Sequence, residues 1–241
     1  MTVTSSKLDY SVCESSNEGA IPVIIVAAGN SSRMGGADKQ LLSVSGVPVI
    51  ARTLMNFERS PFISRIILVT REHSIPDMQL IAEKYFISKL SDIVVGGDTR
   101  QASVVYGIER LISSENKALV SDGARMFVTD KMIEDCVKAL GEHDGCLCAV
   151  KVHDTVKSVE DDSVKRTVDR NGLYLAQTPQ GITVSIYKKA IENTDLSQFT
   201  DDASVLESAG ADVVIVNGDR KNIKITTPED IALAEILLRE R

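Results

Sequence analysis

The chain has 241 residues, with 34 Asp and Glu against 27 Lys and Arg, so its formal net charge is -7. A chain of this length can bury the core of one large α/β domain. An acidic chain without a basic block is a poor candidate for a nucleic-acid-binding protein, because phosphate backbones require a cationic face.

The first twenty residues are polar and have no apolar centre, which argues against a secretory signal. We expect residues 1–20 to form a mobile N-terminal extension that precedes a single domain over residues 21–241. No apolar run approaches the length that spans a bilayer. We therefore expect neither a membrane nor a nucleic-acid partner.

Apolar runs and helical spacings then alternate along the chain. Strands are predicted over residues 23–28, 65–69, 93–95, 118–121 and 146–152. Helices are predicted over residues 47–57, 78–85, 103–112 and from the expected N-cap Thr129 to residue 140. This alternation predicts an α/β fold with a mostly parallel sheet, helices on both faces and right-handed crossovers.

The pattern changes after residue 150. Residues 151–177 are polar, with a turn near Asp161 and Asp162, which predicts a β-hairpin arm that protrudes from the sheet. Further helices are predicted over residues 184–191 and 201–210, and further strands over residues 212–216 and 223–225. The last helix is predicted to open with Thr227 as its N-cap and Pro228 at its first position.

The cysteines, at positions 13, 136, 146 and 148, show no disulfide framework. Cys146 and Cys148 alternate along a predicted strand and so share one face. The three histidines are scattered and lie in no metal-ligand spacing. Buried reduced thiols are the preferred interpretation, and they fit a reducing cytoplasm.

The loop after the first predicted strand carries the strongest functional signal. The apolar run ends at Gly29 in a loop of small polar residues that contains Arg33 and Lys39. Open α/β sheets bind ligands beyond the C-terminal ends of their strands, and small residues let main-chain N–H groups approach phosphates. We therefore predict a nucleoside triphosphate site, with a solvated turn as the alternative. The spacings of a P-loop ATPase and of a dinucleotide dehydrogenase are both absent.

A second loop, residues 96–103, joins a predicted strand to a predicted helix. Gly97 permits close backbone approach, Asp98 and Ser103 offer hydrogen-bond partners, and Arg100 is a fork-shaped donor. Helix capping by Asp98 is the alternative interpretation.

Three more polar positions complete the candidate site. Asp122 ends a predicted central strand and suits a metal or ribose partner, with a turn residue as the alternative, and Arg125 follows it. Arg125 is alternatively a surface ion-pair partner. Lys224 alternates with its apolar neighbours in the last predicted strand, and it is a solvated outer-face lysine if that strand lies at a sheet edge.

Seven motifs occur in an order that resembles one known family. They are AAGNSSRMGGADKQ, GGDTRQAS, SDGAR, HDTVK, TVDRNGLYLAQTPQ, TDDAS and NIKITTPEDIALAE, from about Ile21 to the C-terminus. The chain resembles the 2-C-methyl-D-erythritol 4-phosphate cytidylyltransferases of the non-mevalonate isoprenoid pathway. Ser31 and Asp38 stand where that family usually has glycine and proline. The resemblance implies a Rossmann-like nucleotidyltransferase fold and a homodimer paired through the arm, residues 151–177.

The resemblance also implies roles for individual residues. The implied catalytic residues are Arg33, Lys39, Lys224 and Asp122. The implied nucleotide-binding residues are Ala27, Ala28, Gly29, Gly97, Asp98, Arg100 and Ser103. The implied substrate-binding residues, some of them from the partner subunit's arm, are Arg125, Thr155, Arg170, Thr178 and Thr200. Without the motif match, the three threonines would be interpreted as ordinary turn hydroxyls.

The implied reaction is in-line attack by the substrate's phosphate oxygen on the α-phosphorus of CTP, with pyrophosphate leaving. Mg²⁺, held mainly by the CTP phosphates with Asp122 orienting its water shell, is the expected cofactor. A ribitol 5-phosphate cytidylyltransferase is the nearest alternative, and residues 167–172 favour methylerythritol phosphate. A non-catalytic CTP-binding protein is a more distant alternative.

Overall fold

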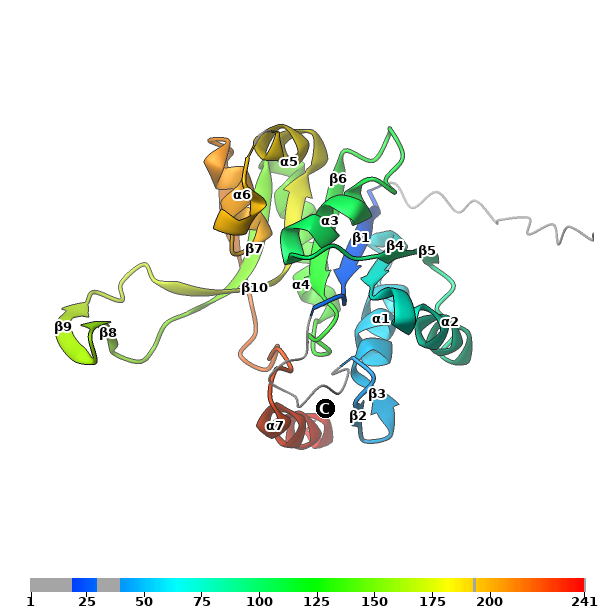
Figure 1. Cartoon of the computed structure of the whole chain (residues 1–241), viewed down its shortest axis with the longest axis horizontal. Coiled ribbons are helices and arrows are strands. Elements are labelled where there is room, and N and C mark those ends of the chain that lie inside the picture. Colours follow the sequence, from blue (N-terminus) through cyan, green and yellow to red (C-terminus); the bar gives the residue numbers. More distant parts are fainter. Residues whose placement is uncertain (1–18, 30–39, 193, 241) are drawn as a thin grey trace, which may run out of the picture.

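The computed structural model describes residues 19–29, 40–192 and 194–240. A seven-stranded sheet in the order β11-β7-β10-β6-β1-β4-β5 forms its centre (Figure 1). The strands are β1 (Ile21–Val26), β4 (Ile63–Thr70), β5 (Leu90–Val95), β6 (Lys117–Asp122), β7 (Gly145–Lys151), β10 (Tyr174–Thr183) and β11 (Val213–Asn217).

The sheet is mostly parallel, as predicted. β1 pairs in parallel with β4 and β6, β4 with β5, and β11 with β7. β10 is the exception, since it runs antiparallel to both β6 and β7. The sequence interpretation missed β10 because Pro179 and its polar neighbours interrupt the apolar pattern, and the β7 pairing shifts register there, between Ala176 and Gln180.

Helices cover both faces of the sheet, which confirms the predicted α/β architecture. They are α1 (Val49–Arg59), α2 (Ile75–Lys84), α3 (Arg100–Ile108), α4 (Asp130–Glu142), α5 (Val184–Ile191), α6 (Asp202–Ser208) and α7 (Pro228–Arg239). Successive residues of β1 point to opposite faces. Val23 and Ile25 therefore pack with α1 and α4, whereas Ile24 and Val26 pack with α3, α5 and α6.

Local capping explains where several helices begin. Thr129 accepts a hydrogen bond from the Met132 N–H at 3.3 Å, and Thr227 forms a capping box with Asp230, so both predicted N-caps are confirmed. The helix predicted over residues 103–112 instead spans Arg100–Ile108, because Thr99 caps it. Thr99 rather than Asp98 supplies that cap, which contradicts the alternative role considered for Asp98.

The strand predicted over residues 223–225 is wrong, because no strand is assigned there. This segment is irregular backbone beside the loop that follows β6, where the Ile225 N–H donates to the Ala124 carbonyl oxygen at 2.9 Å. Ile225 is buried in a third core with Phe127 and Ala234 of α7. The short strands β2 (Ser43–Val44) and β3 (Val47–Pro48), which sequence analysis did not predict, lie beside this core.

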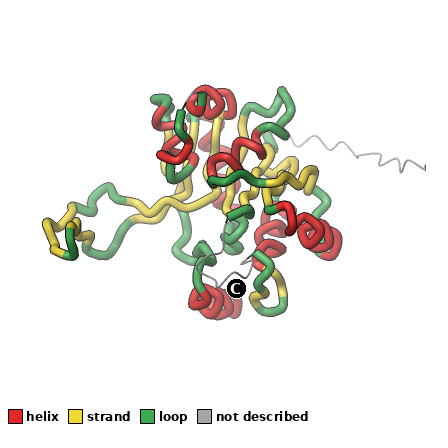
Figure 2. The backbone as a smooth tube through the Cα atoms, in the orientation of Figure 1, coloured by secondary structure: helices red, strands yellow, loops and turns green. Residues whose placement is uncertain are grey.

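A β-hairpin formed by β8 (Val156–Glu160) and β9 (Ser163–Val168) lies within the predicted arm. Its turn is at Asp161 and Asp162, whose φ angles of 48° and 58° suit a tight hairpin connection. Figure 2 shows loop segments separating this hairpin from the main sheet. Pairing of the arm with a second subunit stays a prediction.

Cys136, Cys146 and Cys148 are buried free thiols, and the Sγ atoms of Cys136 and Cys148 lie 3.5 Å apart. Cys13, and almost all of the predicted N-terminal extension, lie outside the described residues. Within the described ranges, every helix is too short or too polar to cross a membrane.

Candidate active site

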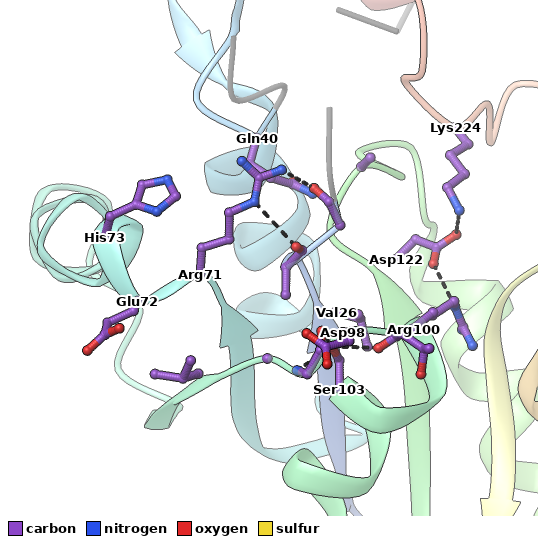
Figure 3. Close-up of a pocket in the computed structure, with 17 residues that line it drawn as sticks. Val26, Gln40, Arg71, Glu72, His73, Asp98, Arg100, Ser103, Asp122 and Lys224 are labelled. Carbon is purple, nitrogen blue, oxygen red and sulfur yellow. Dashed lines mark hydrogen bonds and ion pairs between the residues drawn. The ribbon is translucent and has the colours of Figure 1, made fainter. Parts of the chain in front are cut away.

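The C-terminal ends of β1, β4, β5 and β6 meet at one edge of the sheet, beside a cavity of about 440 Å³ (Figure 3). This is the place where the loop pattern predicted a ligand. The cavity lining includes Ala28, Gly29, Gly97, Asp98, Arg100 and Ser103 from the predicted nucleotide-binding set, together with Asp122 and Lys224.

The floor of the cavity requires small residues. A Cβ atom added to Gly96 would collide with the Ala28 methyl group and lie 2.9 Å from the Ser103 hydroxyl oxygen. A Cβ atom added to Gly97 would lie 2.6 Å from the Ala102 methyl carbon. The Gly97 N–H donates to the Ser103 hydroxyl at 3.1 Å, which ties the loop after β5 to α3. The loop after β1 and the loop after β5 therefore pack closely together, and their small residues leave backbone groups accessible to a planar ligand.

Arg71, directly after β4, holds the loop that leaves β1. Its Nε donates to the Ala28 carbonyl oxygen at 3.3 Å, and its Nη2 donates to the Gly29 carbonyl oxygen. Sequence analysis did not single out Arg71, although a cation directly after a parallel strand at this edge was an available signal. Arg33 and Lys39, the predicted cations of that loop, lie outside the described residues.

The carboxylate of Asp122 is surrounded by three cations. Its Oδ2 lies 2.9 Å from Lys224 Nζ and 3.5 Å from Arg125 Nε, and its Oδ1 lies 3.4 Å from Arg100 Nε. Burial by itself would raise the pKa of Asp122, but the charges of these three side chains outweigh burial and hold the pKa well below its usual range. Asp122 is therefore an anion that keeps three cations together at the sheet edge.

Arg100 connects Asp122 to a second buried carboxylate. Its Nη2 lies 2.6 Å from Asp202 Oδ2, and Tyr187 donates its hydroxyl to Asp202 Oδ1 at 3.2 Å. Burial disfavours the charge of Arg100, but Asp202 and Asp122 outweigh that effect and raise its pKa further. Its Nη1 is buried and has no hydrogen-bond partner within the described ranges. An unpaired donor of this kind is costly, since a buried polar group has lost its water.

A second cavity, of about 250 Å³, lies against the first. Arg100, Asp122 and Lys224 line both cavities, so these three side chains form a charged wall between them. Arg125, Thr178 and Thr200, three residues of the predicted substrate-binding set, also line the second cavity. Two anionic ligands could therefore meet across one shared set of cations.

The comparisons with known proteins identify the family. The family model for 2-C-methyl-D-erythritol 4-phosphate cytidylyltransferase matches residues 21–240. The chain belongs to this family. The cytidylyltransferase of Geobacter metallireducens is 41% identical over 229 residues, which cover 92% of this chain and 99% of that protein. That of Bacillus cereus strain ATCC 14579 is 43% identical over 220 residues, or 90% of this chain and 97% of that protein.

Solved structures of this cytidylyltransferase family have the same fold. The 4-diphosphocytidyl-2C-methyl-D-erythritol synthase of Anaerococcus prevotii is 31% identical, with a TM-score of 0.81 over 92% of this chain and 97% of its own. The cytidylyltransferase of Thermus thermophilus is 28% identical, with a TM-score of 0.75 over 91% of this chain and 99% of its own. The predicted nucleotidyltransferase fold is therefore confirmed.

Of the predicted site residues that the structure describes, three line neither cavity of this cytidylyltransferase chain. Ala27 is buried, and its N–H donates to the Val69 carbonyl oxygen at 2.7 Å. Thr155 and Arg170 are exposed on the arm, and Arg170 donates to the His153 carbonyl oxygen. Their predicted roles at a partner's site stay predictions. Thr178, by contrast, contacts the site directly. Its hydroxyl accepts a hydrogen bond from the Asp122 N–H at 3.0 Å and so helps to hold Asp122 in place.

The donors of the site fit a magnesium ion that arrives with the nucleotide. Mg²⁺ keeps several waters and takes one or two carboxylates together with substrate phosphates. Across the described segments, no three His, Cys, Asp or Glu side chains cluster as a metal site, and Asp122 is the carboxylate shared by both cavities. Both Asp122 oxygens already face cations, so contact through the ion's water shell suits Asp122 better than direct coordination.

The low pKa of Asp122 gives the folded state a specific dependence on pH. A carboxyl whose pKa is lower in the folded than in the unfolded chain contributes stability above the unfolded value, and that contribution is lost as the pH falls. At pH 7 we expect Asp122→Asn to lower the free energy of unfolding by roughly 2 kcal/mol, less than for a fully buried pair because Lys224 is 38% exposed.

The difference between wild type and Asp122→Asn should shrink as the pH falls below about 4, the range in which an unfolded Asp becomes protonated. Urea denaturation from pH 3 to pH 7 measures it. Asp161→Asn, at the arm turn, is the matched control and should change the free energy of unfolding by less than about 0.5 kcal/mol. A difference that stays constant over this pH range would contradict the assigned charge cluster.

Proposed function

We propose that this chain transfers CMP from CTP to 2-C-methyl-D-erythritol 4-phosphate, releasing pyrophosphate and forming 4-diphosphocytidyl-2-C-methyl-D-erythritol. The observation that carries the proposal is the wall of Arg100, Asp122 and Lys224 between two cavities. The nucleotide occupies the larger cavity and the sugar-alcohol phosphate occupies the smaller one. The phosphates that react then meet at the wall.

The main obstacle to this reaction is electrostatic. A phosphomonoester is already anionic near neutral pH, so it needs no strong general base, but it must approach a triphosphate of the same sign. Positioning and charge neutralisation therefore dominate catalysis. A substrate phosphate oxygen forms a bond to the α-phosphorus, and the bond from that phosphorus to the oxygen bridging to the β-phosphate breaks.

The cations of the wall act at this step. Lys224 and Arg100 face both cavities and are placed to donate to phosphate oxygens from either side, while Arg125 faces the substrate cavity. Asp122 holds these groups in place and limits their mutual repulsion. Magnesium bound to the nucleotide phosphates would supply further charge neutralisation of the leaving pyrophosphate. Arg33 and Lys39 are proposed to contact the triphosphate, on the motif match alone.

Cytosine selection is proposed to come from the close packing of the loops after β1 and β5. The Gly96–Ala28 contact leaves room only for a thin ligand, and the backbone groups there can satisfy the hydrogen-bonding edge of one base. Asp98 is exposed in the cavity with its carboxylate unused by the α3 cap, so it is available to the nucleotide.

A panel of substrates tests the proposed function. Pyrophosphate release should require CTP, Mg²⁺ and methylerythritol phosphate together, and ribitol 5-phosphate should support turnover at least about 100-fold less well, because a site built to pair substrate hydroxyls rejects mismatched ones. UTP and ATP serve as nucleotide controls. Equal turnover with ribitol 5-phosphate would favour the alternative sugar phosphate, and CTP binding without any release would favour a non-catalytic protein.

Lys224 is the residue whose removal should affect chemistry most directly. We expect Lys224→Ala to lower kcat by about 10²–10³-fold, by analogy with the loss of one preorganised donor at a developing charge. The control Lys131→Ala removes an exposed lysine of α4 and should leave kcat unchanged. Pyrophosphate release measures both, with circular dichroism to verify folding. Near wild-type turnover by Lys224→Ala would remove this lysine from the mechanism.

We further propose that two subunits exchange arms, so that Thr155 and Arg170 complete the partner's substrate cavity. Val159 and Val164 of the arm are 55% and 62% exposed, which suits burial against a second copy. The buried free thiols fit a reducing, cytoplasmic location for the proposed dimer.

Mixing inactive variants tests the exchange of arms. If arms act in trans, a heterodimer of Lys224→Ala and Arg170→Ala subunits has one site with both defects and one intact site. Equimolar co-refolding should then restore about a quarter of wild-type activity, because half of the random dimers are mixed. Activity no higher than that of the separate variants would contradict the exchange, and mixing Lys224→Ala with Lys224→Gln is the matched control.

A further inference from the structure

The first residue of α6 is a carboxylate with no solvent-exposed surface, Asp202. Its backbone N–H donates to Gln180 Oε1 at 3.0 Å, so β10 fixes the main chain of this residue. Its Oδ1 accepts the Tyr187 hydroxyl, and its Oδ2 pairs with Arg100. Both carboxylate oxygens and the main chain are therefore held, by residues from α3, α5 and β10.

A buried ion pair of this kind is weak support for stability, because desolvating two charges offsets much of their attraction. An apolar contact between α3 and α6 would join these helices as well. The pair of Asp202 and Arg100 instead sets the direction of the Arg100 guanidinium, because a carboxylate and a guanidinium form hydrogen bonds in a defined plane. The Tyr187 hydroxyl fixes that carboxylate in turn, and burial with the nearby Asp202 charge raises the pKa of Tyr187, so it remains a donor.

The two carboxylates that contact Arg100 differ in how strongly they hold it. The Asp202 contact measures 2.6 Å, whereas the Asp122 contact measures 3.4 Å. Asp122 is closer to Lys224, at 2.9 Å. Arg100 can therefore turn its Nε away from Asp122 toward a phosphate while Asp202 retains Nη2.

We propose that Asp202 and Tyr187 are positioning residues, which hold the Arg100 guanidinium at the boundary of the two cavities so that it donates to the phosphates of both substrates. This inference rests on the proposed transfer reaction. Neither residue lines either of the two cavities, so each acts through Arg100. The arrangement places one cation, anchored at its Nη2 by Asp202, where the bond to the α-phosphorus forms.

Two conservative variants test this role. Asp202→Asn removes the charge that holds Nη2, and we expect kcat/KM for CTP and for methylerythritol phosphate to fall about 10–100-fold each, as when a charged partner is lost. Tyr187→Phe removes one hydroxyl and should lower both values about 3–10-fold, the effect of one hydrogen bond. Tyr85→Phe, at the end of α2, is the matched control and should leave both unchanged.

A double-mutant cycle separates positioning from a purely structural role. In an Arg100→Gln background, Tyr187→Phe or Asp202→Asn should lower kcat/KM by less than about twofold further, because the group through which they act is gone. Multiplicative losses in the double variants would overturn the proposal, as would wild-type kinetics in both single variants. If Asp202→Asn fails to fold, the Tyr187→Phe cycle decides alone.

The cycle also distinguishes this inference from the proposed function. Wild-type protein that binds CTP in calorimetry but releases no pyrophosphate with methylerythritol phosphate would refute the transfer reaction, and the positioning role with it. Wild-type protein that turns over normally, with Tyr187→Phe indistinguishable from it, would refute only the positioning role.

Discussion

The Asp122 carboxylate, held among Lys224, Arg100 and Arg125, is the interaction on which the rest of the site depends. These cations come from three different segments of the chain, and without an anion between them they would repel one another at this separation. Asp122 can take this place because β6 is a central strand that ends at the cavity edge, and because Thr178 binds its backbone N–H. A single carboxylate thus assembles a surface of net positive charge.

That surface suits the chemistry proposed for it. Two anions must approach closely before a bond can form between them, and fixed cations lower the cost of that approach without reorganising during the reaction. The wall of shared side chains explains how one set of cations serves two ligands. The close packing of Gly96 against Ala28 serves a separate purpose, because it limits the room at the floor of the larger cavity.

The two carboxylates that contact Arg100 hold it with different strength. The buried contact with Asp202 anchors one end of the guanidinium, whereas the longer contact with Asp122 leaves the other end free to turn. A residue 102 positions further along the chain therefore sets the direction of a side chain in the nucleotide loop. Such long-range second partners are invisible to motif analysis, although Asp202 lies inside the TDDAS motif that helped to reveal the family.

The sequence by itself determined the alternation of strands and helices, the arm turn at Asp161–Asp162, the N-caps Thr129 and Thr227, and the family. These features depend on local periodicity, capping and turn chemistry, which a linear pattern records. It also predicted which loops meet, because parallel strands bring their C-terminal ends to one edge.

Only the tertiary structure decided the rest. Sequence analysis missed β10 because its pairing with β6 and β7, rather than the alternation of its own apolar and polar residues, makes it a strand. The segment around Lys224 has strand-like alternation but forms irregular backbone, from which the lysine reaches Asp122 while remaining partly exposed. Contacts between segments far apart in the sequence bring Arg71, Tyr187 and Asp202 to the site. Such contacts depend on how the elements pack in three dimensions, and no local rule specifies them.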